Sequence, residues 1–391
     1  MVLAALVVAA AAAPAPAAEL SAAMGKALFE RAWIPAPAST DATDGLGPLF
    51  SGRACAACHP GGGPARLRAA GGLVGGRGVV VRFGDAAGRP DPRYGAQLQE
   101  EAVPGLTPEG RLIPGGGRVV RLALNGPPPQ PGIRAGLRLA PSLAGRGALE
   151  RIDAAAVLSL ADPDDRDGDG ISGVARLIGS PEGGKPRLGR FGWKAASPDL
   201  RSQVASAFAL DMGLSSTDAP LPFGDCTAAE TDCLAAPTGI RPGGKGQEID
   251  DQIIRLVTDF AAGRPLPAAA ADPEAMRLLG RAGCVACHVP TLPDAAGTPV
   301  PVFTDLLLHD MGADLDDGVG EPDAASAEWR TAPLIDLGRR NGIRRYLHNG
   351  GAASIAAAIA LHGGEAAASR RRFAALAAAD RAKLLRLLEG M

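Results

Sequence analysis

A short pattern, Cys-x-x-Cys-His, occurs twice in this chain and constrains its fold more than any other feature. Each copy combines two thiols with an adjacent imidazole, at Cys55, Cys58 and His59 and again at Cys284, Cys287 and His288. Two thiols at this spacing can form thioethers with the vinyl groups of one haem, and the imidazole can bind the iron from the proximal side. The pattern therefore predicts two covalently bound haem c groups.

Zinc binding and thiol redox chemistry are the competing uses of such cysteines. Paired Cys-x-x-Cys knuckles of zinc sites usually lie about 15–20 residues apart, whereas Cys55 and Cys284 are far more distant. A thioredoxin-like pair needs a strand that leads into a helix, but here a predicted helix precedes the second motif. Neither use explains the two histidines, so covalent haem is the favoured interpretation.

Composition fits a protein that builds its core around prosthetic groups. The 391 residues include 53 Gly and 34 Pro but only 3 Trp, 2 Tyr and 9 Phe, which indicates a loop-rich fold with little aromatic core material of its own. The length allows two or three domains. A net charge of -2 argues against nucleic acid or an anionic membrane as the main partner.

The first residues predict export. "MVLAALVVAAAAAPAPAAELS" has an apolar run that is too short for a membrane span, followed by a small-residue cleavage site, so residues 1–18 are expected to be a signal peptide. A disordered Ala/Pro tail is the alternative. Cys226 and Cys233 lie in a polar loop and predict a disulfide, which fits an oxidising compartment better than free buried thiols do. We expect a soluble periplasmic protein with no membrane span.

Helical periodicity gathers around the two motifs. Helices are expected at 20–33, 148–162, 199–213 and 246–263, and another begins at Pro273 with Asp272 as its N-cap. A last amphipathic helix is expected within 372–391. Helix, motif and closing helix outline a c-type cytochrome module, clearly in 272–391 and more loosely in 20–262. The expected fold is mainly α, with two cytochrome c-like domains that carry long loops and insertions, at 19–262 and 263–391.

The supply of axial ligands differs between the two haems. His59 and His288 occupy two of the four axial positions, and the remaining histidines, His309, His348 and His362, all lie in the C-terminal part. The first haem therefore has no nearby imidazole for its second face, which leaves Met212, Tyr94 or an open site. A haem that reacts with peroxide needs an open or weakly held position, whereas a haem ligated on both faces can only transfer electrons.

Several longer segments resemble one protein family. They are "YGAQLQEEAVPG" (94–105), "GRFGWKAASPDLRSQVASAFALDMGLSS" (189–216), "FTDLLLHDMG" (303–312), "WRTAPLIDLG" (329–338) and "YLHNGGAASIAAAIALHGGEA" (346–366). Over nearly the whole mature chain the sequence resembles the di-haem oxidoreductases, sometimes called thiol oxidoreductases. These proteins are related to bacterial di-haem cytochrome c peroxidases and to methylamine dehydrogenase maturation enzymes. No residue supports the thiol label.

The resemblance implies a second ligand for the C-terminal haem. In the peroxidases the residue fourteen positions after the histidine of a conserved turn is the distal ligand, and this offset runs here from His348 to His362. Ligation by His288 and His362 would lower the haem potential relative to Met ligation. His309 and His348 more often lie near propionates in such folds. Asn349 and Gly351 replace the acid and the arginine of the family's turn, so no role of that pair is carried over.

The resemblance also suggests catalytic residues at the first haem. Heterolysis of bound peroxide needs a distal group that moves a proton, and the relatives use a Glu with a Gln nearby. Glu150 is the best match, with Gln97, Gln99 and Glu100 as further candidates; each could equally be a solvated residue. Trp193 could relay electrons between the haems, as a Trp does in the relatives, or could simply pack in the core.

An acidic loop predicts a calcium site. "DRDGDGISG" spaces Asp165, Asp167 and Asp169 so that their carboxylates converge, and Ile171 can add its carbonyl. Position twelve is Arg176 instead of the usual Glu, so the loop is not a complete EF-hand, although the neighbouring Asp162 and Asp164 could complete the shell. A plain acidic loop without calcium is the alternative.

Together these features predict an exported di-haem oxidoreductase of the peroxidase type. Electrons would pass from a small redox protein, a c-type cytochrome or a cupredoxin, through the C-terminal haem to peroxide or a related oxidant at the N-terminal haem. A non-enzymatic electron carrier with two six-coordinate haems is one alternative. A maturation enzyme that oxidises residues of a partner protein is another.

Overall fold

The computed structural model describes residues 15–40, 43–65, 78–113, 120–179, 183–240, 246–268, 272–338 and 345–391, with side chains from residue 19 onward. The predicted signal peptide, residues 1–18, lies outside the described residues except for its last four, which begin the first helix. Within the described ranges, no helix combines the length and the apolar character that a membrane span requires.

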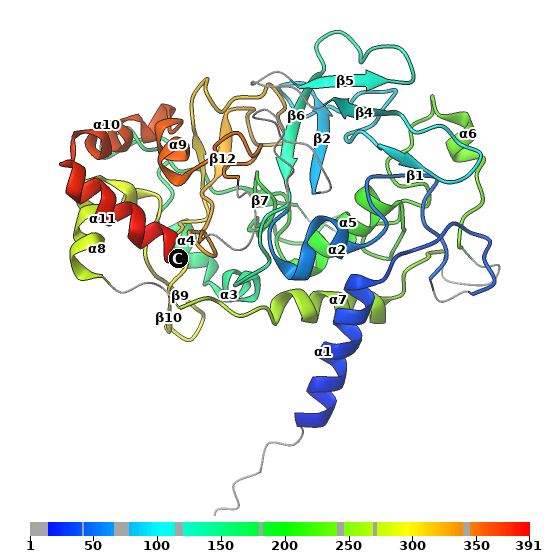
Figure 1. Cartoon of the computed structure of the whole chain (residues 1–391), viewed down its shortest axis with the longest axis horizontal. Helices are drawn as coiled ribbons and strands as arrows, with labels where there is room; N and C mark the ends of the chain where they lie inside the picture. The colour runs from blue at the N-terminus through cyan, green and yellow to red at the C-terminus, as the bar shows by residue number, and fades with distance from the viewer. Residues whose placement is uncertain are drawn as a thin grey trace, which may run out of the picture.

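Runs of short strands and runs of helices follow one another along the chain (Figure 1). The helices are α1 (Ala15–Glu30), α2 (Cys55–Cys58), α3 (Arg146–Arg151), α4 (Ala154–Leu158), α5 (Leu200–Met212), α6 (Thr231–Leu234), α7 (Asp251–Ala262), α8 (Pro273–Arg281), α9 (Ile355–Ala360), α10 (Ala367–Ala375) and α11 (Ala378–Glu389). The strands are β1 (Leu49–Phe50), β2 (Val79–Gly84), β3 (Glu101–Ala102), β4 (Gly110–Ile113), β5 (Arg121–Leu124), β6 (Arg134–Leu139), β7 (Leu177–Ile178), β8 (Arg187–Leu188), β9 (Leu292–Pro293), β10 (Pro299–Val300), β11 (Leu308–Asp310) and β12 (Glu328–Arg330).

The expectation of a mainly α fold is wrong. About 30% of the described structure is helical and 15% is strand, and the strands form six separate two-stranded sheets. Long segments punctuated by Gly and Pro cannot continue a helix, so their buried backbone groups find partners by pairing with distant strands. The largest pair joins β2 to β6, with Val79 opposite Leu139 and Gly84 opposite Arg134.

The N-terminal helices enclose an aromatic core. In Figure 1, α1 runs downward from the body and crosses α7. These helices share a core cluster that contains Phe29, Trp33, Phe208 and Met212. The Trp33 and Phe208 rings meet edge to face at 5.9 Å. Cys55 packs against this cluster, so the first Cys-x-x-Cys-His motif lies beside the core of these helices.

A second helical core surrounds the other motif. Helices α8, α10 and α11 gather at one end of the molecule (Figure 1), and their apolar faces share a cluster that includes Leu278, Phe373 and Leu384 and packs against Cys284. The predicted N-cap is confirmed, because the Asp272 carboxylate accepts hydrogen bonds from two amides of the first turn of α8.

A third cluster joins the two halves of the chain. Leu149, Phe191 and Leu200 come from the first half, and Val302 and Leu306 come from the second. All five are buried. The two halves expected from the sequence therefore share a hydrophobic core across residue 262, and this core lies close to the segments that hold the histidines of both motifs.

Candidate haem sites

The first motif is a single helical turn that ends in a positioned histidine. Helix α2 consists of Cys55–Cys58, and the His59 Nδ1 atom lies 2.9 Å from the Pro141 carbonyl oxygen. Since the protonated Nδ1 donates to that carbonyl, Nε2 is left as the metal-binding atom. Burial, opposed by the Pro141 bond and assisted by Arg146, lowers the pKa of His59 to about 4. The ring is therefore neutral, as iron ligation requires.

The second motif repeats this arrangement and adds a second imidazole. His288 Nδ1 lies 3.1 Å from the Phe303 carbonyl oxygen, and His362 Nδ1 lies 2.8 Å from that of Ala358. Burial and the nearby His362 lower the pKa of His288 to about 4, and burial also lowers the pKa of His362. Two neutral imidazoles thus lie near each other, each with Nε2 unengaged by its carbonyl partner, an arrangement that suits six-coordinate ligation of one haem.

The surroundings of the motifs fit haem better than zinc. The four motif cysteines are thiols, and burial raises the pKa of Cys55 to about 12 and that of Cys284 to about 11, whereas a zinc site needs thiolates. Buried donor atoms without a hydrogen-bond partner in the described structure are the kind that haem propionates would satisfy; they include Trp33 Nε1, Arg264 Nε and His348 Nε2. Arg264 packs closely on Gly62, three residues after His59. A Cβ at position 62 would lie 2.9 Å from the Arg264 Nε.

His309 is held as a cation between two carboxylates. Its Nε2 lies 2.9 Å from Asp305 and its Nδ1 2.6 Å from Glu365, and its side chain is 4% exposed. Burial lowers its pKa, but the bonds to Asp305, Cys287 and Glu365 outweigh burial and raise it to about 12. Because both ring nitrogens donate to carboxylates, neither is available to an iron. The close approach of Cys287, Asp305 and His309 within 4.8 Å is explained by this ion pair.

His348 belongs to an aromatic cluster. Its ring stacks on Trp329 with centroids 3.6 Å apart and meets Trp193 edge to face at 6.3 Å. Burial, with Arg138 and Lys194 nearby, holds its pKa well below the usual range. Lys194 Nζ lies 3.9 Å from the centre of the Trp329 ring, so the cluster ends in a buried cation.

Trp193 connects a segment near the first motif with the C-terminal half of the chain. Its indole nitrogen donates to the Leu139 carbonyl at 2.8 Å, two residues before the Pro141 carbonyl that orients His59. Its other neighbour is the His348 ring, whose backbone carbonyl accepts the Leu139 amide at 2.6 Å. Trp193 is therefore in contact with the segment whose Pro141 carbonyl orients His59 and with the His348 side chain of the C-terminal half.

The two predicted glutamines lie together at the end of α5. Gln97 donates to Asp211 at 2.8 Å and to the Ser51 hydroxyl at 3.1 Å. Gln99 donates to the Leu210 carbonyl at 2.9 Å and accepts from the Ser51 hydroxyl at 2.9 Å. Asp211 in turn raises the pKa of Cys55, so this network lies within electrostatic reach of the first motif.

Glu150 does not join the glutamines. Its carboxylate accepts the Leu200 amide at 2.9 Å, at the first residue of α5, whereas Gln97 and Gln99 bind near Leu210, ten residues later. Ten helical residues span about 15 Å. The structure therefore separates the predicted proton shuttle from the predicted glutamines by most of the length of a helix.

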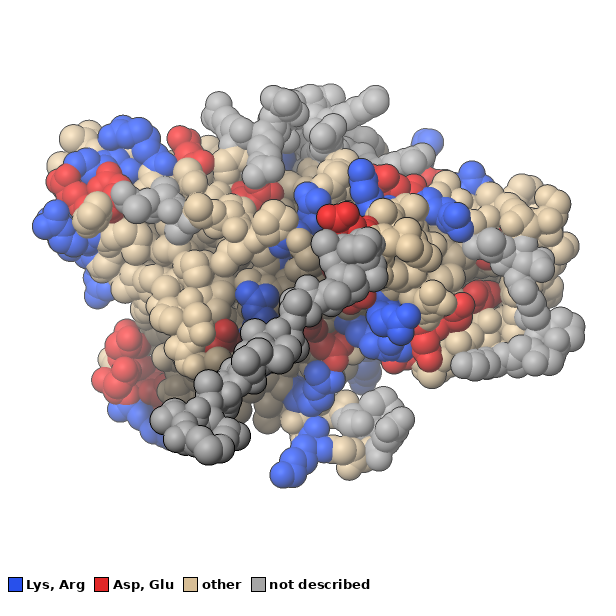
Figure 2. Space-filling view, turned by 90° about the horizontal axis from the view of Figure 1, so that it is seen from below, with Lys and Arg blue, Asp and Glu red and all other residues tan. Residues whose placement is uncertain are grey.

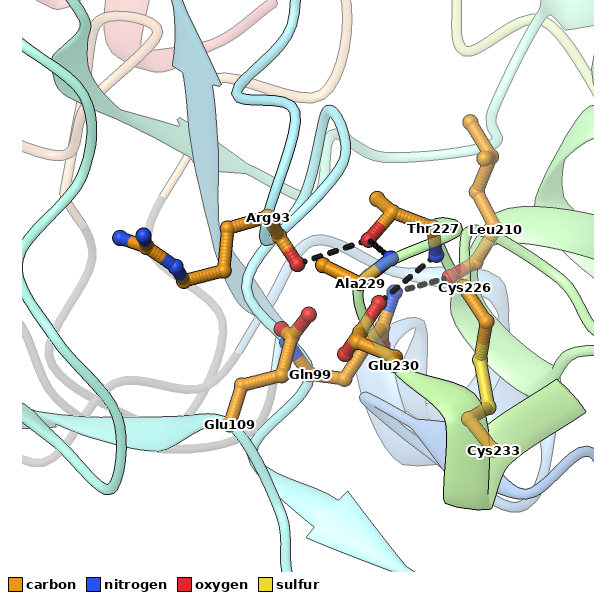
Figure 3. The surroundings of a disulfide bond; sticks show 9 residues. All are labelled: Arg93, Gln99, Glu109, Leu210, Cys226, Thr227, Ala229, Glu230 and Cys233. Carbon is orange, nitrogen blue, oxygen red and sulfur yellow. Dashed lines mark hydrogen bonds between the residues drawn. A yellow bond between two sulfur atoms is a disulfide. The ribbon is translucent and has the colours of Figure 1, made fainter.

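The sequence did not predict an acidic pair beside the disulfide, the buried Glu109 and the partly buried Glu230. The predicted Cys226–Cys233 bond is present, and Figure 3 shows Gln99, Glu109 and Glu230 around it. Glu109 accepts the Gln99 amide, and burial together with Glu230 raises its pKa to about 10. Glu100, which was named with the glutamines, instead accepts the Leu112 amide at 2.5 Å. Nothing in the sequence indicates that residues 109 and 230 meet.

The acidic loop adopts a compact turn. Oxygens of Asp165, Asp167 and Asp169 lie within 4.8 Å of one another, and Asp169 accepts the Ile171 amide at 2.8 Å. The loop continues into Ser172, whose amide donates to Glu365 at 3.1 Å. Among the two neighbouring acids, Asp164 pairs with Arg166 at 2.9 Å, and Asp162 accepts the Arg166 amide at 2.7 Å.

The two remaining candidates for the second face of the first haem are buried. The Tyr94 hydroxyl donates to the Pro127 carbonyl at 2.5 Å. Met212, 2% exposed, lies in the aromatic cluster against which Cys55 packs.

Comparison with known proteins gives one family. The family model described as "Di-haem oxidoreductase, putative peroxidase" matches residues 129–391, which include the second motif, the acidic loop and Trp193 but not the first motif. No curated protein and no solved structure gives a significant match. Because the match covers well over half of the chain, the protein belongs to the di-haem oxidoreductase family.

Proposed function

We propose that this protein is an exported c-type di-haem oxidoreductase in which the C-terminal haem accepts electrons and the N-terminal haem reduces peroxide or a related oxidant. The observation that carries the proposal is the unequal distribution of imidazoles. His362 lies near His288, His309 is held by two carboxylates and His348 is stacked on Trp329. No second imidazole therefore serves His59.

The residues have separate tasks in this scheme. Cys55 and Cys58 would attach the first haem, and Cys284 and Cys287 the second. When bound, the first haem supplies the iron at which an oxygen–oxygen bond is cleaved. The Pro141 carbonyl keeps the His59 ring in one tautomer and orientation, and His288 and His362 are fixed in the same way by their own carbonyl partners.

Proton supply is assigned to the network at the end of α5. Burial raises the pKa of Asp211, so its carboxyl holds a proton at higher pH than an exposed aspartate does. Gln97 contacts Asp211 and Ser51, and Gln99 contacts Ser51. A general acid with its pKa shifted toward neutrality is suited to proton delivery. Glu150, engaged with the Leu200 amide, fixes the start of the helix that carries Asp211.

Electron transfer between the sites is assigned to Trp193. The indole contacts both the Leu139–Pro141 segment and the His348 ring. The neighbouring Trp329 is less suited to carry a positive charge because Lys194 and Arg138 lie 3.9 and 4.6 Å from its ring centre. A cation against the ring disfavours loss of an electron from it.

The electron donor is proposed to be a small redox protein, a c-type cytochrome or a cupredoxin, that docks beside the second motif. Ala286 of this motif is exposed. Arg372 packs against Gly283, and a Cβ at position 283 would lie 2.6 Å from the Arg372 guanidinium. Arg371 and Arg372 on α10 are exposed. Figure 2 shows Lys and Arg side chains, with acidic ones among them, at this end of the molecule. These arginines favour a donor with an acidic surface.

The proposal also includes calcium binding and export. The acidic loop at 165–171 is proposed to bind calcium, supported by the convergence of three aspartates. Export to the periplasm is proposed from the leader-like N-terminus and from the Cys226–Cys233 disulfide.

Electron paramagnetic resonance of the purified ferric protein tests the function. We expect one high-spin and one low-spin haem, both covalently attached, and we expect peroxide to change the high-spin signal. Two low-spin haems that ignore peroxide would instead identify an electron carrier. A haem-free, zinc-containing product from cells with active cytochrome assembly would reject the proposal altogether.

A further inference from the structure

Two arginines near the haem motifs, the partly buried Arg146 and the buried Arg330, form no ion pair with a carboxylate of the described residues, unlike the buried Arg138 and Arg176. Arg138 pairs with Asp317, and Arg176 pairs with Glu321 at 2.7 Å. In contrast, no ion pair joins Arg146 or Arg330 to a carboxylate in the described part of the chain. Removing a guanidinium from water without an anion is unfavourable, so both side chains are suited to bind an anion that the polypeptide itself does not supply.

Arg146 lies on the side of the first motif. Its Nε donates to the Ser142 carbonyl at 2.8 Å, one residue after the carbonyl that holds His59, and its charge lowers the pKa of His59. Asp336 is its main acidic neighbour, but that carboxylate accepts the Ser142 hydroxyl at 2.6 Å. Burial lowers the pKa of Arg146 to about 10.

Arg330 lies toward the second motif. It is 6% exposed, and its donors bond carbonyls of the described residues, from Nε to Gly192 at 3.0 Å and from Nη1 to Thr331 at 2.9 Å. Burial and the charge of Arg146 lower its pKa to about 9, opposed by Asp305. Asp305 itself is bonded to His309 at 2.9 Å.

The two guanidinium groups therefore repel each other in a region flanked by both haem motifs. Each haem c carries two propionates that take no part in thioether attachment, and guanidinium binds a carboxylate through two parallel hydrogen bonds. We propose that Arg146 and Arg330 form an anion site for propionates of the two haems and thereby raise and couple the reduction potentials of both. This inference rests on the proposed function only in that both haems are bound.

The sign of the effect follows from charge. Reduction removes one positive charge from a haem, so a buried cation nearby favours the ferrous state. Arg146 acts mainly on the haem held by His59. Arg330 lies within electrostatic reach of both Arg146 and Asp305, so it acts on both haems.

Redox titration of the holoprotein tests the proposal. We expect Arg146→Met to shift the redox equilibrium of the first haem about tenfold toward the ferric state, which is about 59 mV for one electron. Arg330→Met should shift both haems in the same direction, and the Lys variants should restore most of each shift. Arg190→Met is the matched control, because Arg190 is also buried and bonded to a carbonyl, that of Leu149 at 3.1 Å, and should leave both potentials unchanged.

The proposal is overturned if both Met variants retain two haems and show the same reduction potentials as the parent. If the Met variants do not accumulate, infrared difference spectra of the parent and of Arg146→Lys, with haem propionates labelled with carbon-13, provide a second test. An identical labelled carboxylate band in the two proteins would exclude contact between Arg146 and a propionate. Neither measurement uses peroxide, so loss of peroxide reactivity would contradict only the proposed function.

Discussion

Replacing His309 by Gln should weaken the C-terminal half through the loss of one buried cation. The parent side chain is 4% exposed and bonds to Asp305 at 2.9 Å and to Glu365 at 2.6 Å. Glutamine can donate to one carboxylate but carries no charge, so two buried acids lose their shared cation. Breaking such a buried pair costs about 3–5 kcal/mol, and we expect the free energy of unfolding to fall by this amount at pH 7.

The pH dependence gives a sharper test, because its sign and slope are set by one group. The pKa of His309 is raised from 6.5 to about 12, so its contribution is complete below pH 6.5 and is lost as the pH rises toward 12. Each pH unit in that interval removes at most about 1.4 kcal/mol. The pKa of Glu365 is lowered, so its contribution to the free energy of unfolding does not change with pH above the ordinary titration range of a glutamate. Between pH 7 and 9, the parent should lose about 2.7 kcal/mol that the variant does not lose.

Urea unfolding of both holoproteins at pH 7, 8 and 9, followed by far-ultraviolet circular dichroism and by haem absorbance, measures the difference. Other shifted groups, such as Glu109 and Lys194, titrate equally in parent and variant and cancel. His348→Gln is the matched control, since this buried histidine lies 3.9 Å from its nearest carboxylate, Asp317, and has a lowered pKa. Parallel stability curves for the parent and the His309 variant would refute the assignment of a buried imidazolium.

Three further outcomes are expected. His362→Ala should convert the C-terminal haem to high spin while both haems stay attached, and an unchanged spectrum would show that another group binds that iron. Chelator should lower the melting temperature of the parent. If calcium had been present at a hundred times its dissociation constant, the loss in free energy of unfolding would be about 2.7 kcal/mol. Asp167→Ala should abolish this response. Replacing Cys226 and Cys233 by Ser should cost about 2.5 kcal/mol, the loop-closure entropy of a short loop whose cysteines are 7 positions apart, as measured by urea unfolding under non-reducing conditions.

Local features of the site could be predicted because their chemistry lies in neighbouring residues. The Asp272 cap and the Cys226–Cys233 bond each depend on a few adjacent positions, and the structure contains both. The family was identifiable for the same reason, since segments such as 303–312 and 346–366 are contiguous in the chain. Periodicity likewise located α5 and α7 within a few residues of their observed ends, and the predicted start of α8 at Pro273 is observed.

Long-range contacts could not be predicted, and they decide the rest of the site. The sheet pairing of Val79 with Leu139 has no local signature, which is why strand was underestimated in the fold. The proximity of Glu109 to Glu230 and of Arg146 to Arg330 also arises only when distant segments pack. In the last two cases a polar residue that the sequence suggests is exposed, Glu109 or Arg330, is buried by an element elsewhere in the chain.

The strength of the second axial ligand would distinguish the two haems also in a protein whose first haem has Met212 as its second axial ligand. Tyr94 is committed to the Pro127 carbonyl, which leaves the thioether of Met212 as the nearest alternative in the core that packs against Cys55. A neutral thioether is a weaker axial ligand than imidazole and yields more readily to an incoming oxidant. His362, in contrast, is neutral, oriented by the Ala358 carbonyl and close to His288. An open site and a Met-bound site are therefore both compatible with the proposal that the oxidant reacts at the haem of His59 and that electrons enter at the haem of His288.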